Sequence, residues 1–169
     1  MAEDVIGRFI EEEGRYPESV GIILWATSNL RNHGQCVAEF LYLMGLRPVW
    51  QPGSQRVVDL EVIPLEELQR PRVDVTGRIS GLFRDSMPGS VIWLDDAAQR
   101  IASLDEPTEL NFVRKHVLEE AGELEKSGLD KQAAWRQASY RVFGDPPGAH
   151  GAGTGAVLEA KNWETIDDI

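Results

Sequence analysis

The sequence of 169 residues lacks the features that mark secreted and membrane-spanning proteins. Cys36 is its single cysteine, which excludes an intrachain disulfide and a zinc site built from several cysteines. No apolar run approaches the roughly 20 residues that a transmembrane helix needs. Met1 is soon followed by Glu3 and Asp4 rather than by the basic and apolar segments of a signal peptide. We therefore expect a cytoplasmic protein with no membrane span.

Positive charge is also scarce. The chain has 17 Lys and Arg residues against 28 Asp and Glu residues, and its formal net charge is -11. Nucleic acids and anionic membrane surfaces select for clustered Lys and Arg side chains, so we expect neither as the main partner. Small molecules and other proteins remain as partners.

A nucleotide-binding motif is missing as well. The glycine-rich segment of residues 144–155 follows a predicted helix rather than a strand, lacks the G-x-G-x-x-G spacing and is not followed by Gly-Lys-Ser/Thr. We therefore expect that ATP does not bind here. Because glycine has no Cβ, the backbone amides of this segment can closely approach a partner or a ligand.

Hydrophobic residues make up 42% of the chain, which is enough for the core of one domain. Their spacing predicts three parts within that single domain of residues 1–169. Residues 1–16 form an N-terminal amphipathic helix, residues 17–105 an α/β core, and residues 106–169 a helical extension that contains the glycine-rich loop.

The first half of the core begins with an apolar run at residues 20–26. It has the length of a strand, and its lack of polar alternation predicts a central parallel strand that is buried on both faces. Asn32 and Gln35 have the spacing of a capping box for a helix that stops at Gly45. Residues 48–50 then form a second strand, which completes a predicted βαβ unit.

The second half of the core begins with alternating apolar and acidic residues at 57–63, a pattern that predicts an edge strand with one wet face. A helical turn at residues 64–68, a buried strand at residues 73–79 and a helix over residues 88–104 follow.

The C-terminal part is predicted to be mainly helical, with polar caps and glycine stops. Its three predicted helices run from Thr108 to near Gly128, from Asp130 to Phe143 before Gly144, and from Thr154 through Asn162. Taken together, the patterns predict an α/β fold with three layers. It has a mainly parallel, flavodoxin-like sheet of about four strands and additional C-terminal helices.

Polar side chains gather where the buried strand of residues 73–79 ends. Arg78 and Ser80 are soon followed by Arg84 and Asp85. In open α/β sheets, ligands usually bind at the carboxyl ends of the strands, because strand ends and helix N-termini leave unpaired backbone groups there. The alternative is that Arg84 and Asp85 form a local ion pair that fastens the turn.

Several motifs of the chain are similar to those of one protein family, in the same order and from Pro17 onward. They include Leu24-Trp25-Ala26-Thr27, His33-Gly34, Gly45-Leu46-Arg47-Pro48, Arg70-Pro71-Arg72-Val73-Asp74, Arg78-Ile79-Ser80-Gly81, Phe83-Arg84-Asp85, Asn111-Phe112-Val113-Arg114-Lys115-His116 and Tyr140-Arg141-Val142-Phe143-Gly144. These motifs resemble the large subunit of the ATP-dependent tetrapyrrole metal chelatases, namely CobN of cobaltochelatase and the H subunit of magnesium chelatase. Family members are far longer, so the resemblance implies an internal segment that need not be active alone.

Four residues depart from the family pattern. Gly77 stands where the family usually has a β-branched residue, Leu82 where it has an aromatic one, and His150 where it has a tyrosine. Gln35 replaces a common acidic residue. An acid–base or ligand role at the start of that helix is therefore not expected.

The resemblance implies that the full protein inserts divalent cobalt or magnesium, as substrate, into a corrin or porphyrin precursor, with cobalt favoured. ATP would be hydrolysed by separate AAA-type partner subunits. Metal insertion requires arginines for the carboxylates of the tetrapyrrole, a base for the pyrrole protons and an apolar clamp. The residues predicted to bind the tetrapyrrole are Arg78, Ser80, Arg84, Tyr140, Arg141, Gly151 and Gly153.

The predicted catalytic residues are His33, Asp85 and His150, and no metal ligands are assigned. Imidazole and carboxylate groups can each accept a proton, although Asp85 is better suited to orienting Arg84. His116 is assigned a structural role, because it falls on the buried stripe of its predicted helix. Two other functions remain open: a scaffold or subunit-docking domain, and a flavodoxin-like protein that binds another anionic small molecule.

Overall fold

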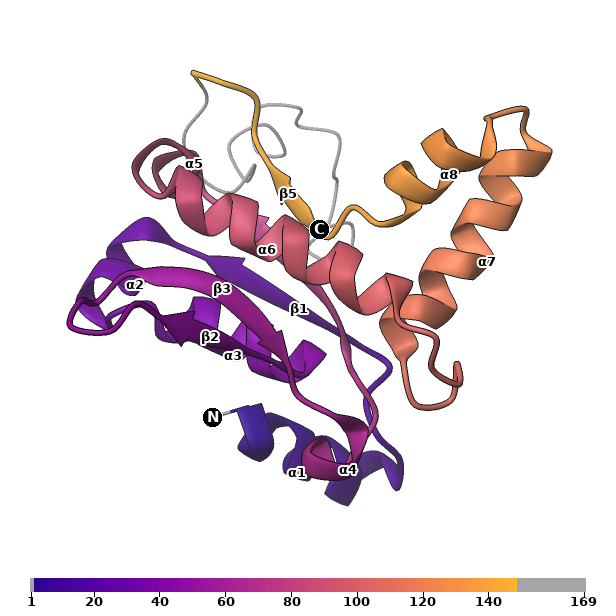
Figure 1. Cartoon of the computed structure of the whole chain (residues 1–169), viewed down its shortest axis with the longest axis horizontal. Coiled ribbons are helices and arrows are strands. Elements are labelled where there is room, and N and C mark those ends of the chain that lie inside the picture. The colour runs from indigo at the N-terminus through magenta and orange to yellow at the C-terminus, as the bar shows by residue number, and fades with distance from the viewer. Residues whose placement is uncertain (1, 149–169) are drawn as a thin grey trace, which may run out of the picture.

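The computed structural model describes residues 2–148 of the chain (Figure 1). Helices and strands alternate through the first two thirds of this range, and helices dominate afterwards. The elements are α1 (Ala2–Glu13), β1 (Ser19–Leu24), α2 (Ala26–Arg31), α3 (Gln35–Met44), β2 (Leu46–Trp50), β3 (Val57–Val62), α4 (Leu65–Leu68), β4 (Asp74–Ile79), α5 (Gly81–Ser86), α6 (Pro88–Ser103), α7 (Phe112–Lys126), α8 (Lys131–Ala138) and β5 (Val142–Gly144).

β1, β4 and β5 form a parallel sheet with β4 in the centre. β1 pairs with β4 from Ser19 opposite Asp74 to Leu24 opposite Ile79. The parallel sheet with added C-terminal helices confirms the predicted α/β class, with three strands rather than about four. The prediction that β1 is central is wrong: β4 is its sole strand partner within residues 2–148, and Ile23 is 53% exposed.

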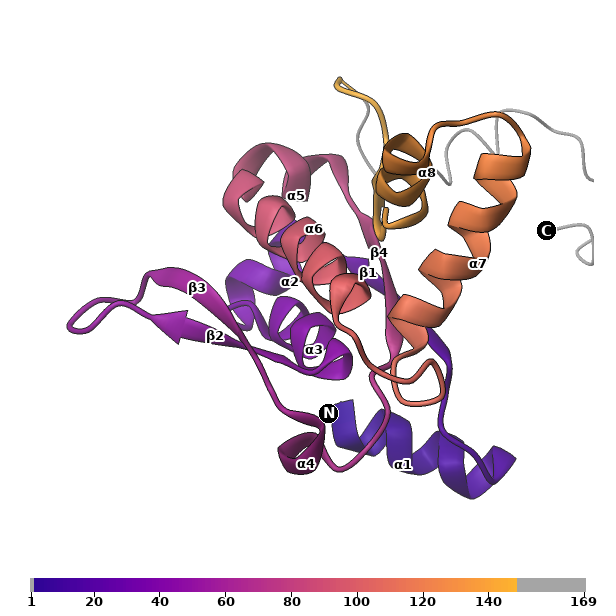
Figure 2. The same ribbon diagram turned by 45° about the vertical axis from the view of Figure 1, so that its right-hand side comes forward.

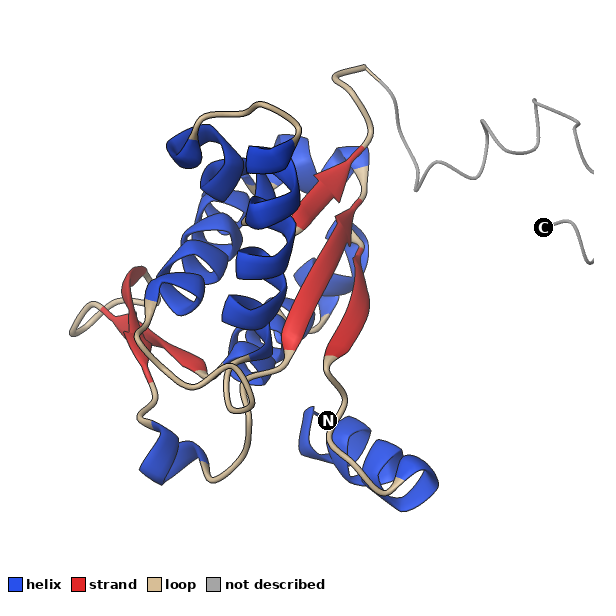
Figure 3. Cartoon of the chain, turned by 90° about the vertical axis from the view of Figure 1, so that its right-hand side faces the viewer, coloured by secondary structure: helices blue, strands red, loops and turns tan. Residues whose placement is uncertain are grey.

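Helices cover mainly one side of this sheet (Figure 3). Val75, Gly77 and Ile79 alternate along β4 and are buried, whereas Thr76 between them is exposed. A Cβ on Gly77 would lie 3.1 Å from Leu24 and 3.3 Å from the ring of Phe40. The absence of a side chain at Gly77 therefore lets α3 pack closely on β4.

The predicted βαβ unit is wrong, because β2 pairs with β3 rather than with β1. The two strands form a separate antiparallel sheet, which projects from the rest of the chain (Figure 2). They are joined by a short turn that contains Gly53 in a left-handed conformation, φ +74°. Such a local hairpin forms at little entropic cost, and it takes β2 away from the parallel sheet. β3 is an edge strand, as predicted, but it belongs to the hairpin and not to the parallel sheet.

The C-terminal part differs from its prediction at two helix ends. The N-cap of α7 is Asn111, whose side chain accepts from the Arg114 amide at 2.9 Å, and not Thr108. Asp130 caps α8 as predicted, but α8 ends at Ala138 and the following residues form β5 beside β4. The glycine-rich segment therefore does follow a strand. The predicted helix that begins at Thr154 lies outside the described residues.

Arg72 joins four parts of the fold. Its side chain is fully buried and pairs with Glu106, with two nitrogen–oxygen distances of 2.8 Å. It also donates to the carbonyls of Gly45, at the end of α3, and Ile63, after β3, at 3.0 and 2.9 Å. A buried guanidinium requires such partners, because an unpaired charge in the core is strongly destabilising.

Candidate functional site

The carboxyl end of β4 carries four of the predicted site residues. Ser80 caps α5, since its hydroxyl accepts from the amide of Phe83 at 3.2 Å, and the residue is 3% exposed. Arg84 binds Asp85 through two hydrogen bonds of 2.8 and 3.1 Å. The bond to Asp85 raises the pKa of Arg84, so this guanidinium stays charged. The local ion pair considered from the sequence is therefore present.

Both arginines also hold the segment that follows β5. Arg78 pairs with the carboxylate of Asp145 at 2.5 Å. Arg84 donates to the carbonyls of Asp145 and Pro146 at 2.6 and 2.8 Å. The second carboxylate oxygen of Asp145 is buried, and within residues 2–148 it has no hydrogen-bond partner. The arginines thus join the start of the glycine-rich segment to the end of β4.

A second polar group lies beside the first residues of β4, where β5 does not reach. Asp74 is 5% exposed and accepts from Arg141 Nε at 2.6 Å and from His116 Nδ1 at 2.8 Å. An ionised carboxylate only accepts hydrogen bonds, so Nδ1 of His116 carries the proton. The Nε2 atom of the same ring lies 3.5 Å from Glu18.

Lys115 balances the charge of Glu18 at this group, through an ion pair of 2.6 Å. This hydrogen bond holds the pKa of Glu18 below its ordinary value. His116 is partly exposed, with 27% of its side chain accessible. It lines a cavity of about 410 Å³ together with Thr76, Tyr140 and other residues.

Tyr140 stands between the two polar groups. It lines the cavity beside His116, and it also lines a cavity of about 420 Å³ beside Arg84 and Asp145. The residue is 43% exposed, and the centroid of its ring lies 4.6 Å from the guanidinium carbon of Arg136. An exposed aromatic ring at this place can pack against a flat ligand in either cavity.

Of the remaining predicted residues, only Arg141 belongs to one of these groups, the one around Asp74. Arg141 is buried against Asp74, and it also donates to the carbonyls of Ala138 and Tyr140. His33 lies in the connection between α2 and α3 and lines a different cavity. His150, Gly151 and Gly153 lie outside the described residues.

Sequence reasoning missed the Asp74–His116 pair. The spacing of His116 puts it on the buried stripe of α7 and predicts a structural role. One signal was available: Asp74 is a carboxylate inside an otherwise apolar strand start, between Val73 and Val75. A charged side chain in that position needs a cationic or hydrogen-bonding partner. The sequence could not indicate which residue, far along the chain, would supply it.

Across residues 2–148, no three His, Cys, Asp or Glu side chains are placed so that they could hold a metal ion. Of the helices in the same range, none combines the length and the apolar character needed to cross a membrane.

Comparison with known proteins decides the family. The sequence model of the CobN/Magnesium Chelatase family matches residues 1–169. The chain belongs to this family. Among the relatives of this chain, the aerobic cobaltochelatase subunit CobN of Pseudomonas aeruginosa is 44% identical over 165 residues, or 98% of the chain. The chloroplastic magnesium-chelatase subunit ChlH of Oryza sativa subsp. indica is 38% identical over 167 residues, or 96% of the chain.

A solved structure extends the similarity to the fold. The catalytic subunit of cobaltochelatase from Mycobacterium tuberculosis superposes with a TM-score of 0.86 and 44% identity, over 99% of this chain. The chain spans 14% of that structure, 13% of the Pseudomonas protein and 12% of the rice protein. It therefore corresponds to a small part of these relatives.

Proposed function

We propose that the chain is a segment of the tetrapyrrole-binding subunit of an ATP-dependent cobaltochelatase, which inserts divalent cobalt into a corrin precursor. The observation that carries the proposal is the 44% identity to CobN of Pseudomonas aeruginosa over nearly the whole chain. The lower identity of 38% to the rice magnesium-chelatase subunit favours cobalt over magnesium.

We assign ATP hydrolysis to separate AAA-type partner subunits. The 169 residues contain no Gly-Lys-Ser or Gly-Lys-Thr sequence, which a phosphate-binding loop of the common type requires. In this scheme the chain contributes to the cavity for the tetrapyrrole. Contacts between subunits couple ATP hydrolysis to that cavity.

Arg78 and Arg84 are proposed to bind carboxylates on the rim of the tetrapyrrole. A planar guanidinium binds a carboxylate through two parallel hydrogen bonds, and Arg78 already binds the carboxylate of Asp145. A substrate carboxylate would take the place of Asp145 on Arg78. Ser80 supports this arrangement, because it caps the helix that carries Arg84. Tyr140 would pack against the macrocycle, and the backbone of Gly151 and Gly153 would approach it.

We assign Arg141 an indirect role, because it is buried against Asp74. Together these two residues orient His116, which we propose as the acceptor for a pyrrole proton. In support, the hydrogen bond between Nδ1 and Asp74 orients the ring of His116, and 27% of the side chain is accessible. Asp85 orients Arg84 in this proposal, and His33 and His150 remain alternative acceptors.

Titration of the purified chain with hydrogenobyrinic acid diamide and with protoporphyrin tests the proposal, with pigment absorbance as the readout. We expect saturable binding of the corrin-type pigment, weakened about tenfold in Arg78→Ala and in Arg84→Ala, because a hydrogen bond to a charged group is lost. Arg47→Ala is the matched control, since Arg47 is also doubly ion-paired but lies on the hairpin. Binding that is equally weakened in all three variants, or absent from a folded chain, contradicts the proposal.

Subunit docking is the second candidate function. The side of the sheet that helices leave open exposes Ile23 and Thr76, and Phe143 of β5 is 47% exposed. Apolar residues on an open sheet face favour contact with another protein surface. A chain that binds the ATPase subunits but neither pigment would support docking over tetrapyrrole binding.

A further inference from the structure

The arginines at the end of β4 are occupied by groups of the chain itself. Arg78 binds one carboxylate oxygen of Asp145 at 2.5 Å, and the two side chains are 33% and 14% exposed. Arg84 donates to the backbone carbonyls of Asp145 and Pro146 at 2.6 and 2.8 Å. Asp145 therefore presents to Arg78 a carboxylate, the same chemical group that a tetrapyrrole carries on its rim.

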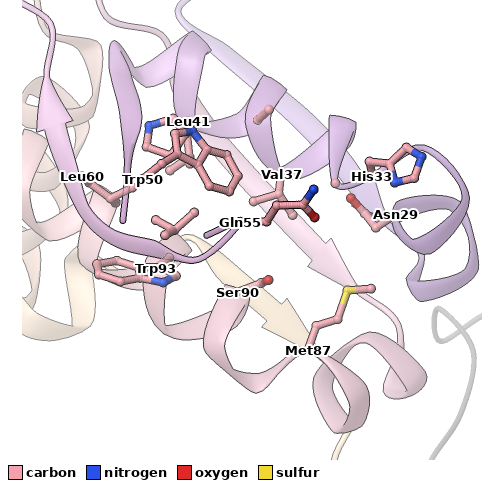
Figure 4. Close-up of a pocket in the computed structure, with 14 residues that line it drawn as sticks. Asn29, His33, Val37, Leu41, Trp50, Gln55, Leu60, Met87, Ser90 and Trp93 are labelled. Atoms are coloured by element: carbon pink, nitrogen blue, oxygen red, sulfur yellow. The ribbon is translucent and has the colours of Figure 1, made fainter. Parts of the chain in front are cut away.

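The carboxylate of Asp145 is only half satisfied in this position. Three buried side-chain oxygens lack a hydrogen-bond partner within residues 2–148, namely Asn29 Oδ1, Asp96 Oδ2 and Asp145 Oδ2. Asn29 is uncharged and lines a different cavity, between α3, the β2–β3 hairpin and α6 (Figure 4). Asp96 Oδ2 still lies 2.6 Å from Arg100 Nε in an ion pair. A buried carboxylate oxygen without a donor is destabilising, so Asp145 is held less tightly than a carboxylate with both oxygens bound.

The backbone around Asp145 is fixed, whereas its side chain has room to move. A Cβ on Gly144 would lie 2.8 Å from Cγ1 of Ile79, so the end of β5 packs directly against the end of β4. Arg84 then holds the carbonyls of Asp145 and Pro146. The side chain of Asp145 borders the cavity of about 420 Å³, which gives it space for another rotamer. Asp145 can thus leave Arg78 without any change of fold.

We propose that Asp145 is an internal competitor for Arg78, which occupies the carboxylate site until a ligand carboxylate replaces it. The inference rests on the proposed function in one respect, namely that Arg78 binds ligand carboxylates. The competitor lowers the apparent affinity by the fraction of molecules in which Arg78 is open. Because 33% of the Arg78 side chain is accessible, a ligand carboxylate can reach it before Asp145 has left. By linkage, a partner that draws Asp145 away strengthens ligand binding by the same factor.

Glutarate and glutaramide test the proposal, because they share a carbon skeleton and only glutarate is charged. The ¹⁵N-labelled chain of residues 1–169 and its Asp145→Asn variant are titrated with each, and the Nε–H resonance of Arg78 is followed by NMR. We expect saturable shifts with glutarate, with about tenfold tighter binding in Asp145→Asn, because the competing charge is gone. Glutaramide should shift the resonance in neither form. Equal affinities of the two forms for glutarate would overturn the proposal, as would equal binding of glutarate and glutaramide.

Asp95→Asn is the matched control. Asp95 borders the same cavity and binds an arginine, but that arginine is Arg136. The variant removes the same charge, so an equal gain in glutarate affinity would assign the effect to net charge and overturn the role of Asp145. Should Asp145→Asn fail to fold, the unchanged chain still decides: the backbone amide of Asp145 and the Nε–H of Arg78 should respond to glutarate with one dissociation constant. A shift of Arg78 without any shift of Asp145 would overturn the exchange.

A pigment titration separates this inference from the proposed function. Asp145→Asn should bind hydrogenobyrinic acid diamide about tenfold more tightly than the unchanged chain does. If Asp145→Asn gains affinity for glutarate but neither form binds the pigment, the internal competition stands and the tetrapyrrole role fails. If both forms bind the pigment equally and Arg78→Ala still weakens binding, the tetrapyrrole role stands and the internal competition is overturned.

Discussion

The imidazole of His116 donates from Nδ1 to the buried carboxylate of Asp74 at 2.8 Å, although the two residues are 42 positions apart in the sequence. Arg141 approaches the other oxygen of the same carboxylate at 2.6 Å. Three elements of the fold thus meet at one acidic side chain: α7, the start of β4 and the residue that precedes β5.

Asp74→Asn should lower the free energy of unfolding by about 3–5 kcal/mol, because it leaves the Arg141 guanidinium buried without a negative partner. Urea unfolding of both forms measures the difference. Asp95→Asn is the matched control, since Asp95 also binds an arginine, Arg136, but in a more exposed pair. Its cost should be about 1 kcal/mol or less. Equal losses in the two variants would show that burial does not determine the importance of Asp74.

Gly45→Ala should destabilise the chain by about 3 kcal/mol or more, for two reasons. Gly45 has φ +83°, a conformation that is unfavourable for a residue with a Cβ, and that Cβ would lie 2.3 Å from Arg72 Nη1. Arg72 cannot move aside without breaking its buried pair with Glu106. Gly53→Ala separates the two effects, because Gly53 has φ +74° with nothing within 4 Å of a Cβ.

The Gly53→Ala variant should therefore show the backbone cost alone, about 1–2 kcal/mol. Thermal and urea unfolding of both variants give the comparison. If the two alanines cost the same, the contact between Gly45 and Arg72 is not tight in solution.

Gly77→Val introduces the β-branched type of residue expected at this position from the family pattern. It should destabilise this chain by about 1–3 kcal/mol, because the new side chain would crowd Leu24 and Phe40. Phe40→Leu frees space, so the double variant should recover part of the loss in urea unfolding. Additive losses in the double variant would mean that Phe40 is not the residue that restricts this position.

The stability of the chain should fall in acid partly through Glu18. The hydrogen bond from Lys115 lowers the pKa of Glu18 in the folded chain below 4.5. A group with a lowered pKa contributes stability that is fully present above its unfolded-state pKa and is lost as the pH falls through its folded-state pKa. In Lys115→Met, the unfolding midpoint in urea at pH 7 should fall, and the further decrease below about pH 4.5 should become smaller.

Lys126→Met is the control for this pH series. Lys126 pairs with Glu123 at 2.6 Å, but both side chains are more than 70% exposed, at 73% and 74%. We expect its pH profile to follow that of the unchanged chain, because solvent screens such a pair. A flattened profile in this variant would show that the loss of any lysine explains the result.

Local patterns predicted much of the secondary structure. The apolar spacing and the glycine stop of α3, the buried strand of β4 and the Asp130 cap of α8 are all found in the structure. These features depend on neighbours within a few residues, so the sequence contains the information that determines them. The grouping of Arg78, Ser80, Arg84 and Asp85 at the end of β4 was predictable for the same reason.

Partners that are distant in the sequence could not be predicted in this way. Val142 and Phe143 were predicted to end a helix that Gly144 stops, yet residues 142–144 form β5, because the end of β4 offers a free edge. β2 has the composition of a strand, but the hairpin with β3 removes it from the parallel sheet. The choice between helix and strand in β5, and between two strand partners in β2, was decided by strand pairing that the local pattern does not contain.

The sequence by itself therefore determined the family, the α/β class and the cluster of charged residues at the end of one strand. Only the tertiary structure decided that Asp145 binds both Arg78 and Arg84. It also decided that Asp74 binds both His116 and Arg141. It also decided that Asn29 is buried with one acceptor unsatisfied. The physical reason is that hydrogen bonds and ion pairs depend on distances of about 3 Å, and folding sets these distances between residues that are far apart along the chain.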